Sequence, residues 1–225
     1  PYIEPQDNVN VVVSDTYTIG PTMINEFRLG FNRRGYTRQP DSFNQDWAKK
    51  LGIPSVAPDT FPDFGLYSLA PGGKAQEMGE DFTLQENFTK TFSRHVVKFG
   101  YELIRTRYNS FSQSLPSGSY SMGATDYPFR PNTGNSFAAF LLGTVTGAQY
   151  TRNNATWLPR WWQHAFYLQD SWKLRRDLAL EVGLRWSYES PFQTKYGQQT
   201  QFDPNVRDPL TGRMGAITHP KDHLA

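Results

Sequence analysis

The feature that most constrains this chain is an alternation of apolar and polar residues on both sides of a short polar turn. Most even-numbered positions between Trp162 and Leu174, and again between Leu178 and Tyr188, are large and apolar, whereas the odd-numbered positions are mostly polar or small. Successive side chains of a β-strand point to opposite faces, so a period of two gives each strand one apolar face. Residues 175–177, Arg-Arg-Asp, connect the two segments, which are predicted to form a β-hairpin.

The same period predicts two more hairpins nearer the N-terminus. In the first, candidate strands over residues 9–19 and 23–34 flank the turn sequence Gly20-Pro21-Thr22. In the second, the strands cover residues 82–92 and 96–108, and the apolar positions change from even to odd between them. The connecting loop must then hold an even number of residues, and we expect it to be the four residues 93–96.

The alternation is weaker between the second and third hairpins. Two short candidate strands cover residues 119–127 and 144–153, which brings the expected total to about eight strands. Residues 137–143, FAAFLLG, separate them without alternation and are expected to form a helical turn that ends at Gly143.

Composition indicates where such strands belong. The mean hydropathy is −0.63, and no stretch approaches the ~20 consecutive apolar residues that a membrane helix needs. A membrane strand needs only ~10 residues, of which every second one is apolar. The predicted fold class is therefore all-β: an antiparallel up-and-down transmembrane β-barrel segment of about eight strands with long external loops. Residues 1–225 are expected to be part of one outer-membrane β-barrel domain.

The connections between the strands predict which way the barrel faces. Short turns follow the first, third and seventh candidate strands, whereas most other connections are long or rich in Pro and Gly, such as residues 39–81 and everything after residue 190. Barrels place short turns in the periplasm and longer loops outside the cell. We therefore expect residues 39–81 to be external.

The aromatic residues of the third hairpin predict a membrane girdle. Trp162 and Trp172 are ten residues apart on one parity. At ~3.3 Å per residue and ~45° tilt they lie roughly 23 Å apart along the membrane normal, close to the ~25 Å apolar band of barrels. Trp186 and Tyr188 are the matching candidates on the second strand.

Several segments of these strands resemble one family. The sequences YLQDSWK (167–173) and LALEVGLRW (178–186) look like consecutive barrel strands of TonB-dependent outer-membrane receptors, especially the Oar-like group with a carboxypeptidase-regulatory-like N-terminal domain. NEFRLGF (25–31), HVVKFG (95–100) and FLLG (140–143) resemble further pieces in the same order. The resemblance implies a barrel closed by a plug domain, outer-membrane lipid around it, and import of a scarce small solute powered through the TonB complex.

The chain is expected to be an internal piece of such a receptor, since neither a plug nor a TonB box is recognisable in its sequence. Two alternatives stay open: a small outer-membrane adhesin or structural barrel, and a soluble carbohydrate-binding β-sandwich. Cysteine is absent, and Lys plus Arg exceed Asp plus Glu by only 23 − 21 = 2. We therefore expect no thiol chemistry and no nucleic-acid partner.

Charged residues of the opposite parity are expected to face the barrel lumen. They could contact a plug or line a solute path, or they could simply pair with each other and hydrate the lumen, and we favour the second reading. These residues are Glu26, Arg28, Arg34, Lys98, Glu102, Glu181, Arg185 and Glu189.

Four aromatic residues of the long loop, Trp47, Phe61, Phe64 and Tyr67, are candidate ligand contacts, or else pack the loop on itself. No enzyme activity, cofactor or metal site is expected. His219 and His223 have helical i, i+4 spacing, but Pro220 lies between them. His164 and Asp170 share the apolar parity, away from any candidate nucleophile.

Overall fold

The computed structural model describes residues 2–54, 56, 60–65, 73–123, 134–152 and 155–219. Contacts divide the chain into two units, which are described separately. Unit 1 comprises residues 1–7, 35–77 and 110–156, and unit 2 comprises residues 8–34, 78–109 and 157–225.

The secondary structure is dominated by β-strands, and two short helices accompany them. The strands are β1 (Tyr2–Ile3), β2 (Gln6–Thr18), β3 (Met23–Pro40), β4 (Ala75–Phe92), β5 (His95–Ser112), β6 (Ser119–Ser121), β7 (Gly147–Gln149), β8 (Pro159–Lys173), β9 (Ala179–Glu189), β10 (Gln193–Thr194), β11 (Gln201–Arg207) and β12 (Met214–Thr218). The helices are α1 (Trp47–Lys50) and α2 (Ser136–Leu141).

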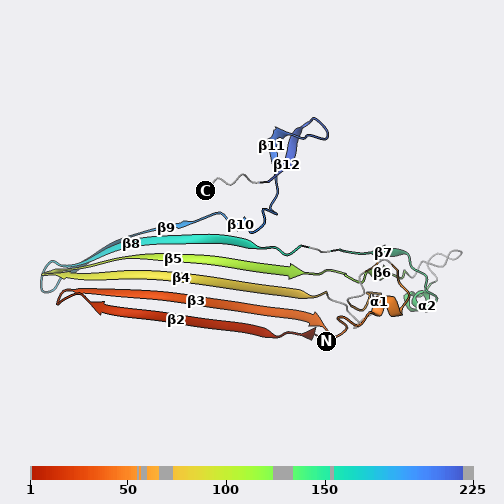
Figure 1. The fold of residues 1–225 in the computed structure, drawn as a ribbon, viewed down its shortest axis with the longest axis horizontal. Helices are drawn as coiled ribbons and strands as arrows, with labels where there is room; N and C mark the ends of the chain where they lie inside the picture. The colour runs from red at the N-terminus through yellow and green to blue at the C-terminus, as the bar shows by residue number, and fades with distance from the viewer. Residues whose placement is uncertain are drawn as a thin grey trace. The chain divides into compact units, whose positions relative to one another are not determined.

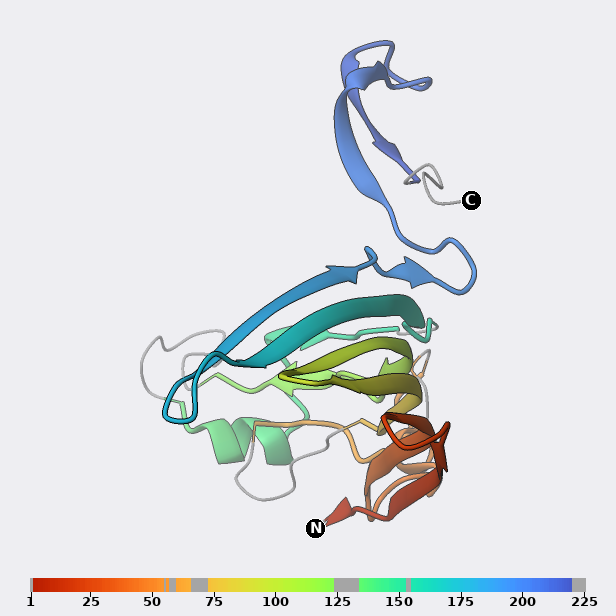
Figure 2. The same ribbon diagram turned by 90° about the vertical axis from the view of Figure 1, so that its left-hand side faces the viewer.

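Six long strands lie side by side in the order β2, β3, β4, β5, β8, β9 (Figure 1). The two-residue strands β1 and β10 complete an eight-stranded sheet by pairing with β3 and β8. β1 with β3, β5 with β8, β8 with β9 and β8 with β10 pair antiparallel, and Figure 2 shows the sheet in a view turned by 90°. The predicted all-β antiparallel class is confirmed.

The three predicted hairpins form, with loops of different length than predicted. The loops are residues 19–22, 93–94 and 174–178, where residues 20–22, 93–96 and 175–177 were expected. β2 and β3 flank Gly20, which has a positive φ of 111°. β4 and β5 are joined by Ser93 and Arg94 alone, so the predicted loop of four residues is too long by two, although its even length is correct. Ser93 has φ of 41°, the left-handed conformation that a tight two-residue hairpin loop requires.

Three strands continue well beyond the predicted ends. β3 reaches Pro40, β4 starts at Ala75 and β5 reaches Ser112, so the long connection covers residues 41–74 rather than 39–81. An alternation of apolar residues marks only the part of a strand whose side chains form an apolar face. Hydrogen bonding between the backbones of two strands does not require this alternation, because any residue except proline offers the same donor and acceptor. The sequence pattern therefore missed the ends of these strands.

The two weak candidate strands are not part of the long sheet. β6 and β7 pair with each other in a separate two-stranded sheet, while β5 pairs directly with β8. Residues 124–127 and 153 of the two candidates lie outside the described residues. The assignment of these segments to the wall was wrong, because three-residue strands are far shorter than the ~9–11 residues of a membrane strand.

The predicted helical turn is confirmed as α2. The Asn135 side chain accepts a hydrogen bond from the Phe137 amide at its start. Gly143 follows the helix with φ of 69° and donates to the Phe140 carbonyl, and Thr144 donates to the Ala139 carbonyl. These two bonds are the Schellman pattern that ends a helix at glycine.

The region after residue 190 also contains strands that were not predicted. β11 and β12 form their own two-stranded antiparallel sheet. Phe202 and Val206 of β11 alternate with polar odd-numbered residues, but Pro204 lies between them. A proline within a short alternating segment argues against a strand, because it cannot donate to a hydrogen-bond ladder.

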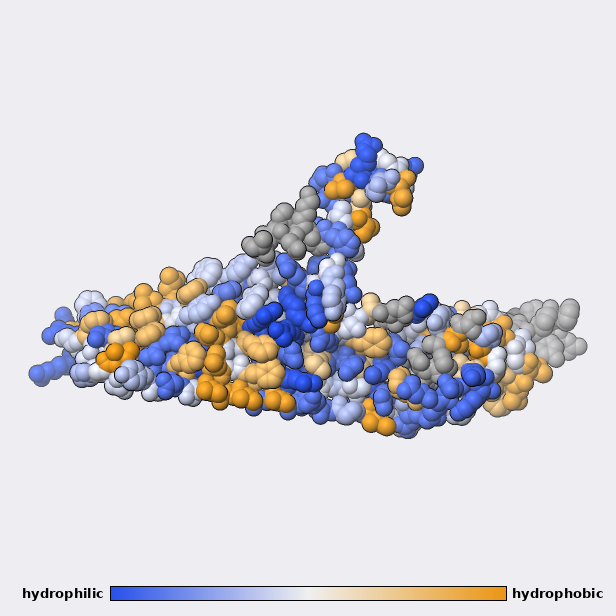
Figure 3. Space-filling view, viewed as in Figure 1, coloured by the Kyte–Doolittle hydropathy of each residue, from blue (hydrophilic) through white to orange (hydrophobic). Residues whose placement is uncertain are grey.

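The long sheet has an exposed apolar face. Leu184 is 76% exposed and Leu168 56%, and the buried hydrophobic residues of the described chain are only Ala48, Ala165 and Ala216. Figure 3 shows hydrophobic residues gathered over the strands. A contiguous apolar surface of this kind calls for an apolar surrounding.

The opposite face contains a close backbone approach at Gly100. Tyr167 lies directly across from Gly100 in the register of β5 and β8, and its hydroxyl donates to Oδ1 of Asn87 at 2.8 Å. A methyl group at Gly100 would stand 2.5 Å from Cε1 of Tyr167 and 2.7 Å from the carbonyl oxygen of Glu86. Glycine therefore leaves the space in which the tyrosine ring lies across β5.

Gly100→Ala should destabilise the fold, because both the tyrosine ring and the backbone of β4 would have to move. We expect a loss of roughly 1–3 kcal/mol in unfolding free energy, as for other overpacking substitutions, measured by urea denaturation of the purified protein. Gly183→Ala is the matched control, because its nearest atoms would lie 3.5 Å away, and it should change stability by less than about 0.5 kcal/mol. An equal effect of the two substitutions would contradict the steric account.

Candidate functional site

Two sets of side-chain hydrogen bonds on the polar face of the sheet together connect four strands. Glu102 on β5 accepts a hydrogen bond from the Gln85 side chain of β4 at 2.6 Å. Its other oxygen lies 3.0 Å from Nη2 of Arg185 on β9. The Tyr167 hydroxyl of β8 reaches Asn87 of β4. The contacts around Glu102 are accessible to solvent, since the Arg185 side chain is 56% exposed and that of Glu102 29%.

The register places five of the predicted lumen charges on this face. Lys98 and Glu102 lie opposite Gln169 and Ala165, and Glu181, Arg185 and Glu189 lie opposite Ser171, Tyr167 and Gln163. Glu26, Arg28 and Arg34 alternate along β3 with the apolar positions Phe27, Leu29 and Phe31. Among these eight charges the structure pairs Glu102 with Arg185, as expected for charges that compensate each other across strands.

The predicted girdle residues all lie on the apolar face. Trp162, Trp172, Trp186 and Tyr188 share the parity of Phe166 and Leu168 in the register of β8 and β9. Trp186 and Tyr188 are stacked with ring centroids 6.2 Å apart. Trp162 lies near the β10 end of β8, and Trp172 lies beside the short turn.

Histidines accompany the tryptophans at both ends of the apolar face. His95 stacks on Trp172 at 5.1 Å, and its Nδ1 lies 2.7 Å from Oδ2 of Asp170. His164 stacks near Trp162 and lies 2.9 Å from the Tyr101 hydroxyl. His164 and Asp170 therefore have different partners, and this arrangement brings no nucleophile, base and acid together.

Two arginines of the apolar face were missed by the sequence reading. Arg105 and Arg107 continue the odd parity of Phe99 and Leu103 on β5. Arg105 pairs in register with Trp162, and its Cζ lies 4.8 Å above that ring. Continuing the strand parity past Leu103 would have found both.

The loop aromatics come together in unit 1. Ring centroids of Trp47 and Phe61 are 5.3 Å apart, and those of Phe61 and Phe64 5.9 Å. Phe64 also contacts Tyr120 and Phe140, at 5.7 and 5.2 Å. Tyr67 lies outside the described residues. The contacts agree with the reading in which these residues pack the loop on itself, and burial raises the pKa of the Tyr120 hydroxyl.

Buried polar contacts join the two long connections inside unit 1. Ser117 accepts a hydrogen bond from the Thr60 amide at 3.0 Å, and Thr60 is fully buried. Asp63 forms a bridge with Ser119, and its carboxylate accepts from the Ser119 hydroxyl at 3.1 Å. The connection 41–74 and the connection after β5 are thus parts of one folded unit.

The part of the chain that the structure describes contains no group of three His, Asp or Glu side chains placed to hold a metal ion. His219 lies 3.0 Å from the Gln199 carbonyl oxygen, and His223 lies outside the described residues. No helix within the described ranges is both long and apolar enough to cross a membrane.

Comparison with known families agrees with the two-faced sheet. A family model described as an outer membrane beta barrel domain matches residues 3–223. No match was found among the curated proteins or among the solved structures. The exposed apolar face is then the lipid side of the wall, which an outer-membrane barrel requires. The chain therefore belongs to the family of outer membrane beta barrel domains, and the protein is located in the bacterial outer membrane.

Proposed function

We propose that this barrel is the wall of a TonB-dependent receptor that imports a scarce solute across the outer membrane. The observation that carries the proposal is the partly exposed polar network of Gln85, Glu102 and Arg185, which gives the inner face of the wall a surface that can contact water, a solute or a plug. The likeness of residues 167–173 and 178–186 to receptor strands supports the same function.

The folded unit of long connections supports capture of the solute. Binding surfaces are commonly built from loops that a rigid scaffold positions. The aromatic cluster of Trp47, Phe61 and Phe64 gives this unit packed side chains, which lowers the entropy lost when a ligand binds.

A small structural or adhesive barrel is the competing function. The soluble β-sandwich is set aside, because the chain belongs to a membrane-barrel family. In the full-length protein, a separable plug distinguishes a plugged receptor from a small barrel.

Leu168→Arg and Leu184→Arg should each impair assembly into the membrane. A cation on the lipid face near mid-depth costs roughly 2–4 kcal/mol. Gln169→Arg, on the polar face, should be tolerated. The readout is the folded fraction of each variant in isolated outer membranes, and tolerance of all three substitutions would contradict the assignment of the faces.

The two ends of the strands should lie on opposite sides of the membrane. Lys49, in the long connection, and Arg176, in a short turn, are both exposed, and the chain has no cysteine. We expect a membrane-impermeant maleimide on intact cells to label Lys49→Cys and not Arg176→Cys, because long loops are external. The reverse pattern would invert the orientation, and labelling at both sites would mean that the segment does not cross the membrane.

The receptor function predicts a closed lumen that opens when the plug is deleted. We expect full-length protein in planar lipid bilayers to show no conductance, and its plug-deleted variant to form large channels. Gln169→Cys, on the polar face, should be protected from a hydrophilic maleimide in full-length protein and labelled after plug deletion. Leu184→Cys, on the lipid face, should stay unlabelled in both. A protein without a separable plug would support the small barrel instead.

A further inference from the structure

We infer that the lipid-facing surface formed by β4, β5 and β8 binds a phosphorylated glycolipid of the outer leaflet, with Arg105 and Arg107 as ligands of its phosphates. The inference concerns the outside of the wall, and it rests on the barrel fold and on the proposed orientation but not on transport. Its basis is a group of arginines on an apolar face, next to an apolar hollow.

Three arginines meet on this face. Arg107 lies directly opposite Arg160 in the register of β5 and β8, and Arg105 lies opposite Trp162 one step further along the same face. The charged side chains that interact electrostatically with the Arg160 guanidinium are Arg107, Arg105 and Glu80. Three cations and one anion leave this group with an excess of 3 − 1 = 2 positive charges.

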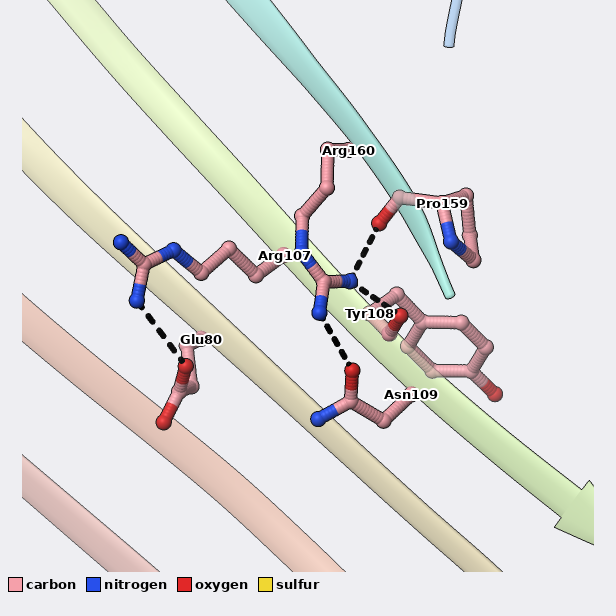
Figure 4. Close-up of polar contacts among 6 residues, drawn as sticks. All are labelled: Glu80, Arg107, Tyr108, Asn109, Pro159 and Arg160. Carbon is pink, nitrogen blue, oxygen red and sulfur yellow. Dashed lines mark hydrogen bonds and ion pairs between the residues drawn. The ribbon is translucent and has the colours of Figure 1, made fainter. Parts of the chain in front are cut away.

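The arginines are fixed in place but incompletely compensated. Arg160 donates to the carbonyl oxygens of Tyr108 and Pro159 and to Oδ1 of Asn109 (Figure 4). Arg107 forms a long ion pair with Glu80, at 3.9 Å, and its Cζ lies 4.9 Å above the Phe82 ring. Like charges directly opposite each other on neighbouring strands repel. A bound anion would remove that repulsion.

Arg105 supplies an independent sign of a missing partner. Its guanidinium lies over the Trp162 ring, and within the described residues its buried Nε has no hydrogen-bond partner. A buried donor without a partner is costly. The planar guanidinium matches the oxygens of a phosphate, with which it can form two parallel hydrogen bonds.

An apolar hollow adjoins the arginines. Its volume is about 470 Å³, and Arg105, Arg107 and Trp162 line it together with Val11, Phe31 and Leu103. Ligand sites commonly have volumes of about 300–1,000 Å³ and combine apolar walls with a few charged groups. A hollow with apolar walls suits an acyl chain. A free phosphate ion has no acyl chain and would leave the hollow unfilled.

The position on the strands selects the occupant. The arginines lie near the end of β5 that leads into residues 113–158. Arg105 is level with Trp162 of the proposed girdle, and Arg107 and Arg160 lie beyond it toward that end. In the proposed orientation this end faces the outer leaflet, whose glycolipid, lipid A, carries phosphates together with acyl chains. The positive charge of the arginines and the apolar shape of the hollow therefore favour lipid A over a soluble anion.

The test is native mass spectrometry of delipidated full-length protein, titrated with lipid A in a non-ionic detergent. We expect R105Q/R107Q to bind lipid A at least about tenfold more weakly than the wild type, because charge-assisted hydrogen bonds are lost. Arg176→Gln removes the same type of charge at the short turn and should bind within about twofold of the wild type. Equal binding by all three proteins would overturn the inference.

Three further probes separate the sources of the phosphate on unmodified protein, so the outcome does not depend on the variant folding. Lipid A without its phosphates should bind the wild-type protein at least about tenfold more weakly than intact lipid A does. Neither phosphatidylglycerol nor inorganic phosphate at the same concentration should displace lipid A. Displacement by phosphatidylglycerol would mean a general phospholipid contact, displacement by inorganic phosphate would mean a simple anion site, and either result would overturn the assignment to glycolipid.

Discussion

The antiparallel hydrogen-bond ladder between β5 and β8 is the constraint on which the rest of the structure depends. It pairs residues continuously from His95 with Trp172 to Arg107 with Arg160, although 46 residues (113–158) separate the two strands in sequence. Side chains alternate with a period of two, so a slip of one residue would move Leu168 and Trp172 to the polar face. This register therefore fixes both the lipid face and the network of Glu102 and Arg185.

The two faces of the sheet are stabilised by different forces. The side chains of the lipid face remain largely exposed within the chain, Leu184 by 76%, so this face depends on the membrane for its apolar surrounding. The polar face depends on contacts within the wall, where Tyr167 crosses Gly100 to reach Asn87 and Arg185 meets Glu102. A substitution therefore has opposite consequences on the two faces, even between neighbouring positions of one strand.

The described residues of the long connections form a folded unit. Buried Thr60 and Ser117 hydrogen-bond to each other, and the aromatic contacts run from Trp47 through Phe61 and Phe64 to Phe140. Such contacts order residues that short-range sequence patterns describe only as loop. For the proposed receptor, an ordered external unit is a better capture surface than a disordered one, because less entropy is lost on binding.

The sequence by itself determined the class of the fold, the three hairpins, the division of the strands into two faces and the helical turn that ends at Gly143. These features depend on side-chain periodicity and turn residues, which are local. Only the tertiary structure decided that β5 pairs with β8, that β6 and β7 leave the wall, that Phe64 meets Tyr120 and Phe140, and that Arg105 lies over Trp162. Each of these is a contact between residues distant in sequence. Strands pair through backbone donors and acceptors, which are the same at nearly every residue. A local sequence pattern therefore does not show which strands will pair.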